Sequence, residues 1–161
     1  MVCRRLPDRW TYPAFYSFVG TGFELPTFGG ESADVIMLFM NEQSAGWLQK
    51  GAFKLEGDKR AVAGAVGELS SQQRDELGKA NLIIYAVRGG KIVGRDFHSN
   101  SFNGFGIGHD NKLNKAIYGI KSSETLLGKQ PGAKPLPEGI AAFQSTLVRQ
   151  FPPNPAGSAH L

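Results

Sequence analysis

The 161-residue sequence predicts an α+β protein with a curved or barrel-like antiparallel sheet and a C-terminal helix packed on that sheet. Two observations lead to this prediction. Short extended segments joined by short connections follow one another through most of the chain, and the longest helical pattern comes only near the C-terminus. Strands followed by helices, without regular alternation of the two, are typical of α+β folds. We expect one domain over residues 1–151 and a disordered, Pro-rich tail over residues 152–161.

The strands are predicted from runs of β-branched and aromatic residues that lie between turn residues. The expected strands span residues 11–19, 22–26, 33–40, 52–55 and 60–66. The clearest pattern is a hairpin of Asn81–Val87 and Lys91–Phe97 around the turn Arg88-Gly89-Gly90. The small residues of "AVAGAVG" (61–67) indicate a strand that something bulky covers closely.

The segment Ala33–Met40 contains six consecutive apolar residues, which begin at Val35. Six residues are too few for a membrane-spanning helix, which takes roughly 20. A run of this length predicts a strand that is central in a sheet or buried on both faces. An aspartate at Val35 or Ile36 is therefore expected to abolish folding, because an unpaired charge would be buried. Asp34 is expected to accept hydrogen bonds from backbone N–H groups at a glycine turn.

Helices are predicted where a capping residue precedes apolar residues at helical spacing. Asn41 or Ser44 is expected to begin a short helix that ends at Gln49. Asp110 is expected to cap a second helix, which runs to about Tyr118 and ends at a glycine. The polar residues 70–79 predict a loop or a solvated helical turn, and a short turn is expected over residues 122–127.

The last predicted helix is Pro137–Phe151. Proline is well placed in the first turn of a helix because its missing N–H is not needed there. Ile140, Phe143 and Leu147 recur at helical spacing, so we expect the helix to lie on the sheet through these three side chains.

The net charge of +4 and the pI near 9.3 favour anionic partners, namely lipid headgroups, nucleic acid or acidic proteins, although a slightly basic soluble surface explains them equally well. Several cations lie near aromatic residues, a composition that suits a membrane–water interface as well as an ordinary protein surface. The alternative for the N-terminal arginines is pairing with Asp8. The candidate lipid-binding residues are Arg4, Arg5, Arg9, Trp10, Lys50, Lys54, Lys59 and Arg60.

Catalytic and cofactor motifs are poorly supported. In "GFGIGHD" the third glycine comes one residue too early for a dinucleotide loop, and no βαβ unit surrounds it. Asp96 and His98 would share one face of a strand while Ser99 points away, which makes a hydrolase triad the weakest of three functional hypotheses. The three histidines have no metal-site spacing, and Cys3 is the single cysteine. We expect no enzyme activity, no metal, no cofactor and no nucleic-acid partner.

Four ordered motifs resemble the SYLF domain, a lipid-binding module of bacteria and eukaryotes. The first is a W-x-x-P-A-F-Y stretch followed by G-G-x-S-x-D and apolar residues, and the second is A-G-P-x-G with Ala65 in place of proline. The third is a Y-S-x-x-x-G hairpin that lacks the family's aromatic residue in its turn, and the fourth is a D-x-x-x-N-x-x-L-Y-G helix end. The matching residues are Trp10, Pro13, Ala14, Phe15, Tyr16, Gly29, Gly30, Ser32, Asp34, Gly57, Ala63, Gly64, Gly67, Tyr85, Gly94, Asp110, Asn114, Tyr118 and Gly119.

The resemblance implies a non-enzymatic module that is peripheral to a membrane and recognises anionic, phosphoinositide-like headgroups. Because eukaryotic members regulate actin, it also implies the alternative of a protein-interaction module with actin or another protein as partner. "MVCRR" is similar to the middle of such a domain, so we expect the N-terminal part of the domain to be missing. Pairing with this missing part is a further alternative for the N-terminal arginines. That part carries a secretory or lipoprotein signal in bacterial members and an amphipathic helix in eukaryotic ones.

Overall fold

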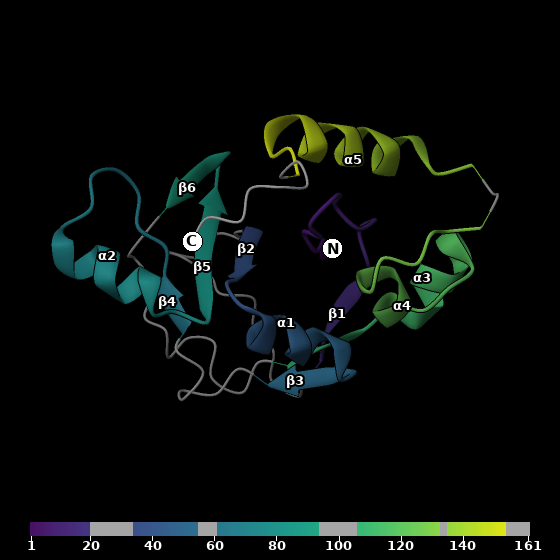
Figure 1. Ribbon diagram of the computed structural model, residues 1–161, viewed down its shortest axis with the longest axis horizontal. Helices are drawn as coiled ribbons and strands as arrows, with labels where there is room; N and C mark the ends of the chain where they lie inside the picture. The colour runs from purple at the N-terminus through teal and green to yellow at the C-terminus, as the bar shows by residue number, and fades with distance from the viewer. Residues whose placement is uncertain (20–33, 55–60, 94–105, 133–134, 154–161) are drawn as a thin grey trace. The chain divides into compact units, whose positions relative to one another are not determined.

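The computed structural model describes residues 1–19, 34–54, 61–93, 106–132 and 135–153 (Figure 1). The chain divides into two compact units. One unit combines Met1–Ser17 with Gly108–Leu161, and the other is Phe18–Ile107. The strand expected at 22–26 lies outside the described residues. Because the N-terminal segment belongs to the same unit as the C-terminal helices, the first unit is built from two distant parts of the sequence.

The unit Phe18–Ile107 contains a four-stranded sheet with β5 (Leu82–Arg88) at its centre. The strands β2 (Asp34–Phe39) and β6 (Lys91–Val93) pair with β5 in antiparallel orientation. The short strand β4 (Ala61–Ala63) pairs with β5 in parallel, which the sequence pattern did not predict. The expected hairpin is confirmed, and its two-residue turn consists of Gly89 and Gly90 at φ 53° and 74°.

One face of this sheet forms the core of the unit. Leu82, Ile84 and Ala86 of β5 are buried, and Val35 and Phe39 are among the β2 and β4 residues that pack against them. The side chains of β2 alternate between this core and solvent. Strict alternation is expected for a strand with one face on a core.

The expectation that this apolar run is buried on both faces is therefore wrong. Ile36 and Leu38, which point away from the core, are 43% and 42% exposed. Both faces of β2 carry apolar side chains, although only one face packs on the core. The hydrophobic pattern alone therefore could not show which face is buried and which is exposed.

The close covering predicted for "AVAGAVG" is confirmed at Gly64. The amide N–H of Gly64 donates to the carbonyl of Ile84 over 2.7 Å. A Cβ atom at position 64 would overlap the ring of Tyr85. Glycine is required here because the aromatic ring lies directly on the backbone.

Two short helices belong to this unit. The helix α1 (Glu42–Gln49) begins at Asn41, whose side chain and that of Ser44 form a reciprocal capping box. The polar segment at 70–79 forms the helix α2 (Ser71–Gly78), with a capping box of Ser70 and Gln73. The strand β3 (Ala52–Lys54) is not part of the four-stranded sheet. It belongs to a separate three-stranded sheet with the order β1-β7-β3.

The described residues of the other unit form three helices. The strands β1 (Tyr16–Val19) and β7 (Gly106–His109) cross the boundary between the units. The helix α3 (Asn111–Tyr118) begins at Asp110, which accepts from the backbone of Leu113, and ends at Gly119 with φ 76°. Both ends confirm the prediction. The helices α4 (Ser122–Leu126) and α5 (Glu138–Gln150) follow.

The α+β class is confirmed, and a C-terminal helix is present. Over the described residues, the sheets are open and do not close into a barrel. One side chain of α5 bonds to the N-terminal segment: Gln144 donates to the carbonyl of Trp10. Of the three side chains expected to pack inward, Ile140 is buried and Leu147 is half-buried, but Phe143 is 40% exposed. The prediction for Phe143 is wrong because the stripe of helical apolar residues is wider than the face that α5 buries.

Candidate functional site

Two of the sequence motifs meet in a buried polar network around Asn114. The side chain of Asn114 is fully buried. Its Oδ1 accepts from the backbone N–H of Phe15 over 3.1 Å, and its Nδ2 donates to Ile120 O and Thr125 Oγ1 over 2.9 and 2.8 Å. Ser122 Oγ donates to the carbonyl of Phe15 over 2.9 Å. The aromatic motif of the N-terminal segment is therefore fixed to α3 and α4 by hydrogen bonds with satisfied partners.

Tyr118 makes the same connection one turn later on α3. Its hydroxyl group donates to the carbonyl of Pro13 over 3.0 Å, and its ring lies 6.1 and 6.0 Å from those of Tyr12 and Phe15. Burial, followed by interaction with Cys3 and Tyr12, raises the pKa of Tyr118 to about 12. Tyr118 and Asn114 thus have structural roles, and neither is a candidate contact for a ligand.

Two residues of the N-terminal segment, Arg5 and Trp10, bind the backbone that follows α5. We call the following set the arginine–tryptophan cluster: Arg4, Arg5, Arg9 and Trp10. The guanidinium group of Arg5 lies 5.9 Å from the centre of the Trp10 ring, within the range of a cation–π contact. Trp10 Nε1 donates to the carbonyl of Phe151, and Arg5 donates to the carbonyl of Pro152, both over 2.7 Å.

The three arginines of the cluster have different surroundings. Arg9 forms an ion pair with Asp8 at 2.7 Å, as the alternative interpretation of the sequence expected. This pair is exposed, so it contributes little to stability, typically below about 1 kcal/mol. Arg4 is half-buried, and its backbone N–H donates to Thr11 Oγ1. Arg5 therefore combines an exposed position with an aromatic neighbour.

Of the second predicted basic group, the structure describes the side chain of Lys50 alone. Lys50 is exposed at the C-terminal end of α1. Lys54 ends β3, and its side chain is outside the description. Lys59 and Arg60 lie outside the described residues, as do Asp96 and His98. The lipid-binding role of these cations stays a prediction.

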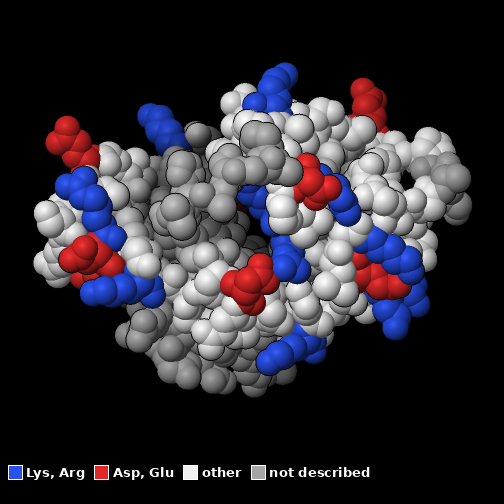
Figure 2. All heavy atoms as spheres, in the orientation of Figure 1, with Lys and Arg blue, Asp and Glu red and all other residues white. Residues whose placement is uncertain are grey.

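A basic surface that the sequence reasoning missed lies on α3 and α4 (Figure 2). We call it the α3–α4 lysine surface, and it comprises Lys112, Lys115, Lys121 and Lys129, all exposed. Figure 2 shows basic side chains around an acidic one over these helices. Helical spacing was the available signal, because Lys112 and Lys115 are three residues apart and face the same way on a helix.

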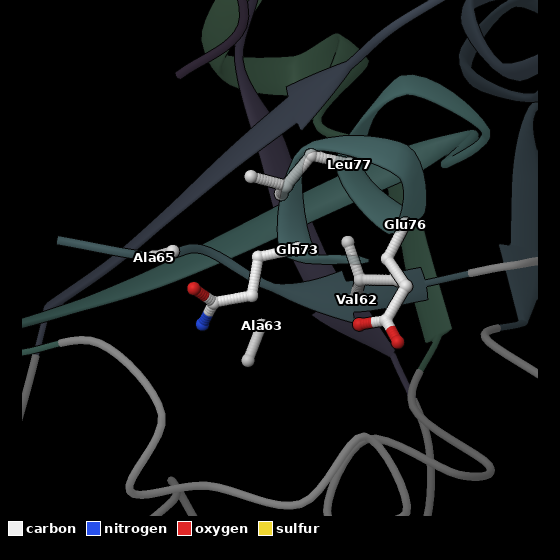
Figure 3. A pocket seen from close by; sticks show the side chains of 6 residues that line it. All are labelled: Val62, Ala63, Ala65, Gln73, Glu76 and Leu77. Carbon is white, nitrogen blue, oxygen red and sulfur yellow. The ribbon is translucent and has the colours of Figure 1, made fainter. Parts of the chain in front are cut away.

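A pocket of ≈ 300 Å³ lies between β4 and α2 (Figure 3). Val62 and Ala63 of the strand, with Ala65 after it, face side chains of the helix. Gln73 and Glu76 contribute its polar groups. Both already accept hydrogen bonds within α2, from Ser70 N and from Gln72 Nε2. The pocket therefore holds no arrangement of groups that identifies a ligand.

Over the described part of the chain, no three His, Cys, Asp or Glu side chains are grouped to hold a metal ion. Burial raises the pKa of the Cys3 thiol to about 11, so at neutral pH this cysteine is a poor nucleophile. No helix in the described ranges combines the length and the apolar character that a membrane span requires.

Comparison of the sequence with models of known protein families identifies the family of this chain. A family model with the description "Ysc84: Las17-binding protein actin regulator" matches residues 19–149, which is most of the chain. The chain belongs to the Ysc84 family. This match confirms the resemblance to the SYLF domain. The description of the family names a binding protein, which agrees with the prediction of a binding module. The α3–α4 lysine surface lies inside the matched residues, whereas the arginine–tryptophan cluster precedes them. No curated protein and no solved structure matches the chain significantly.

Proposed function

We propose that this chain is a non-enzymatic module that binds anionic lipid membranes, with phosphoinositide-like headgroups as the preferred charge, through its arginine–tryptophan cluster. The observation that supports the proposal most strongly is the contact of Arg5 with Trp10 at the end of α5. A cation near an anionic bilayer contributes about 1 kcal/mol, and tryptophan favours the headgroup region.

The apolar surroundings of the cluster support the same partner. Phe151, whose carbonyl accepts from Trp10, has 61% of its surface exposed. Val148, one turn earlier on the helix, is 40% exposed. Exposed aromatic and aliphatic side chains beside cations are what a shallow membrane contact requires.

Flotation with lipid vesicles tests this proposal. The wild type is expected to float with vesicles that contain phosphatidylserine or phosphatidylinositol phosphates and to stay behind with pure phosphatidylcholine. Reversing the charge by Arg4→Glu, Arg5→Glu and Arg9→Glu should remove most of the binding without lowering the melting temperature.

The matched control reverses the same number of charges in the other unit. Arg74→Glu, Lys79→Glu and Lys91→Glu change three exposed cations outside the cluster and should leave flotation close to the wild-type value. Equal loss in both triple variants would point to net charge instead of the cluster. No binding of the wild type to anionic vesicles would refute the proposal.

A second candidate function is binding of a protein partner, because the family description names a Las17-binding actin regulator. Co-sedimentation with actin filaments would test it. Pelleting with filaments, together with no flotation on any vesicle, would favour this second function over the first.

A further inference from the structure

The outward face of α3 combines charge with exposed apolar surface. Lys112 and Lys115 are exposed on it, and Leu113 beside them is 41% exposed. The inward face carries Asn114 and Tyr118, which are buried and hydrogen-bonded as described above. The helix is therefore fixed to its unit on one side while its other side presents cations and a leucine to solvent.

The helix α4 continues this character. Lys121 precedes its first turn, and Leu127 just after it is 62% exposed. The acidic side chain of α4, Glu124, is already engaged, because it accepts from Lys129 Nζ over 2.7 Å and from the backbone of Lys121 over 2.8 Å. Asp110, at the start of α3, likewise accepts from the backbone of Leu113. These two hydrogen bonds lower the pKa of Glu124, so the carboxylate stays charged and neutralises only part of the lysine charge.

The surface has a rigid base. Ser122, Thr125 and Leu126 of α4 are buried, and Thr125 Oγ1 accepts from Asn114 across to α3. Ser122 N–H also donates to Asn111 Oδ1 over 3.0 Å. A partner that binds the outward side chains would not have to order the two helices first, which lowers the entropy lost on binding.

We propose that the α3–α4 lysine surface, with Leu113 and Leu127, is a second contact for an anionic lipid bilayer, separate from the arginine–tryptophan cluster. This inference rests on the proposed membrane function and adds a site to it. Lysine is depleted in protein–protein interfaces, whereas lysine ammonium groups are attracted to an anionic bilayer at about 1 kcal/mol each. The two exposed leucines are placed to enter the apolar boundary of the headgroup layer.

The test removes charge without introducing repulsion. Lys112→Gln, Lys115→Gln and Lys121→Gln leave the pair of Lys129 and Glu124 intact. Losing about 3 kcal/mol of attraction corresponds to roughly a hundredfold weaker partition onto phosphatidylserine vesicles. The matched control, Arg74→Gln with Lys79→Gln and Lys91→Gln in the other unit, should change the partition less than about threefold.

A second variant tests the apolar part. Leu113→Ser with Leu127→Ser keeps every charge and is expected to weaken partition severalfold while the melting temperature stays near the wild-type value. Partition equal to that of the wild type in both the glutamine triple variant and the serine double variant would overturn the inference. A serine double variant that partitions like the wild type, while the glutamine triple variant loses binding, would also overturn it, because the leucines would then play no part in the contact.

The two proposals can fail separately. If the wild type does not bind anionic vesicles at all, the proposed membrane function is wrong, and this inference with it. If the wild type binds, and the variants of the arginine–tryptophan cluster lose binding while the α3–α4 variants do not, the membrane function stands and the second contact is refuted.

Discussion

At the scale of single residues, Asn114 and Tyr118 fix helix α3 to the N-terminal segment. Both belong to a sequence motif, and both are explained by the backbone groups that they bind in the N-terminal segment. The sequence could indicate that these residues belong together in a helix end. It could not indicate their partners, because those partners lie about a hundred positions away in the chain and only the fold brings them close.

Replacing Asn114 by leucine, which is similar in size, should lower the free energy of unfolding by about 3 kcal/mol, because Phe15 N–H and Ile120 C=O would be left buried without partners. Urea denaturation measures this change. The exposed control Gln150→Leu on α5 should alter the same quantity by less than about 0.5 kcal/mol. A similar stability for both variants would show that the network around Asn114 is not needed.

Tyr118 predicts a loss of stability at high pH. Its pKa is raised from 10.0 to about 12, so between these values the folded state keeps a proton that the unfolded state has lost. The stability that the protonated Tyr118 hydroxyl contributes is therefore fully present below about pH 10 and disappears as the pH rises toward 12. Tyr118→Phe should be less stable at pH 7, through loss of the hydrogen bond to Pro13, and its stability should fall less steeply above pH 10. An unchanged slope would contradict this assignment.

At the scale of helices and strands, local signals in the sequence predicted where helices begin and where the hairpin turns. They did not predict which face of a strand or helix is buried. Asn41 and Asp110 begin helices by bonding their own neighbours, so a few adjacent residues determine the outcome. Ser70 also caps a helix in this way, although its segment was expected to be a loop or a helical turn. The buried face of β2 and the inward face of α5 depend on which other elements cover them. An apolar run carries no information about that, and the exposed Ile36 and Phe143 are the result.

The close contact of β4 with β5 can be tested at Gly64. Gly64→Ala should destabilise the protein by about 1–3 kcal/mol, because its Cβ would overlap the Tyr85 ring. The control Gly46→Ala lies in α1 with open space around it and should instead raise stability by up to about 1 kcal/mol. In a Tyr85→Ala background the effect of Gly64→Ala should nearly vanish, and additive effects in this double-mutant cycle would contradict the contact.

The two faces of β2 predict different effects for one substitution. Met37→Asp puts a charge against the core and should prevent folding, as should Val35→Asp. Ile36→Asp faces partly to solvent and should reduce stability by only about 1 kcal/mol. Circular dichroism and thermal melting of the soluble variants distinguish the two cases. Unfolding by Ile36→Asp would restore the expectation that both faces of the strand are buried.

At the scale of the whole molecule, the family could be recognised from the sequence because its motifs occur in order along most of the chain. The positions of the charged side chains on the surface could not be predicted from the sequence. Of the eight predicted lipid-binding residues, the structure shows a side-chain contact between Arg5 and Trp10, and the lipid-binding role of all eight stays a prediction. The fold also places a lysine surface on α3 and α4, which the sequence did not predict. Surface charges are placed by the fold and leave only a weak helical signal in the sequence.

The central claim, that this Ysc84-family chain binds membranes through charge, is tested most directly by the partition of the wild type onto phosphatidylserine vesicles at two salt concentrations. Raising the salt from about 0.1 M to about 1 M shortens the Debye length from about 10 Å to about 3 Å. We predict strong binding at the lower concentration and little at the higher one, with no binding to phosphatidylcholine in either. Binding that is independent of salt and of lipid charge, or no binding at low salt, would contradict the account.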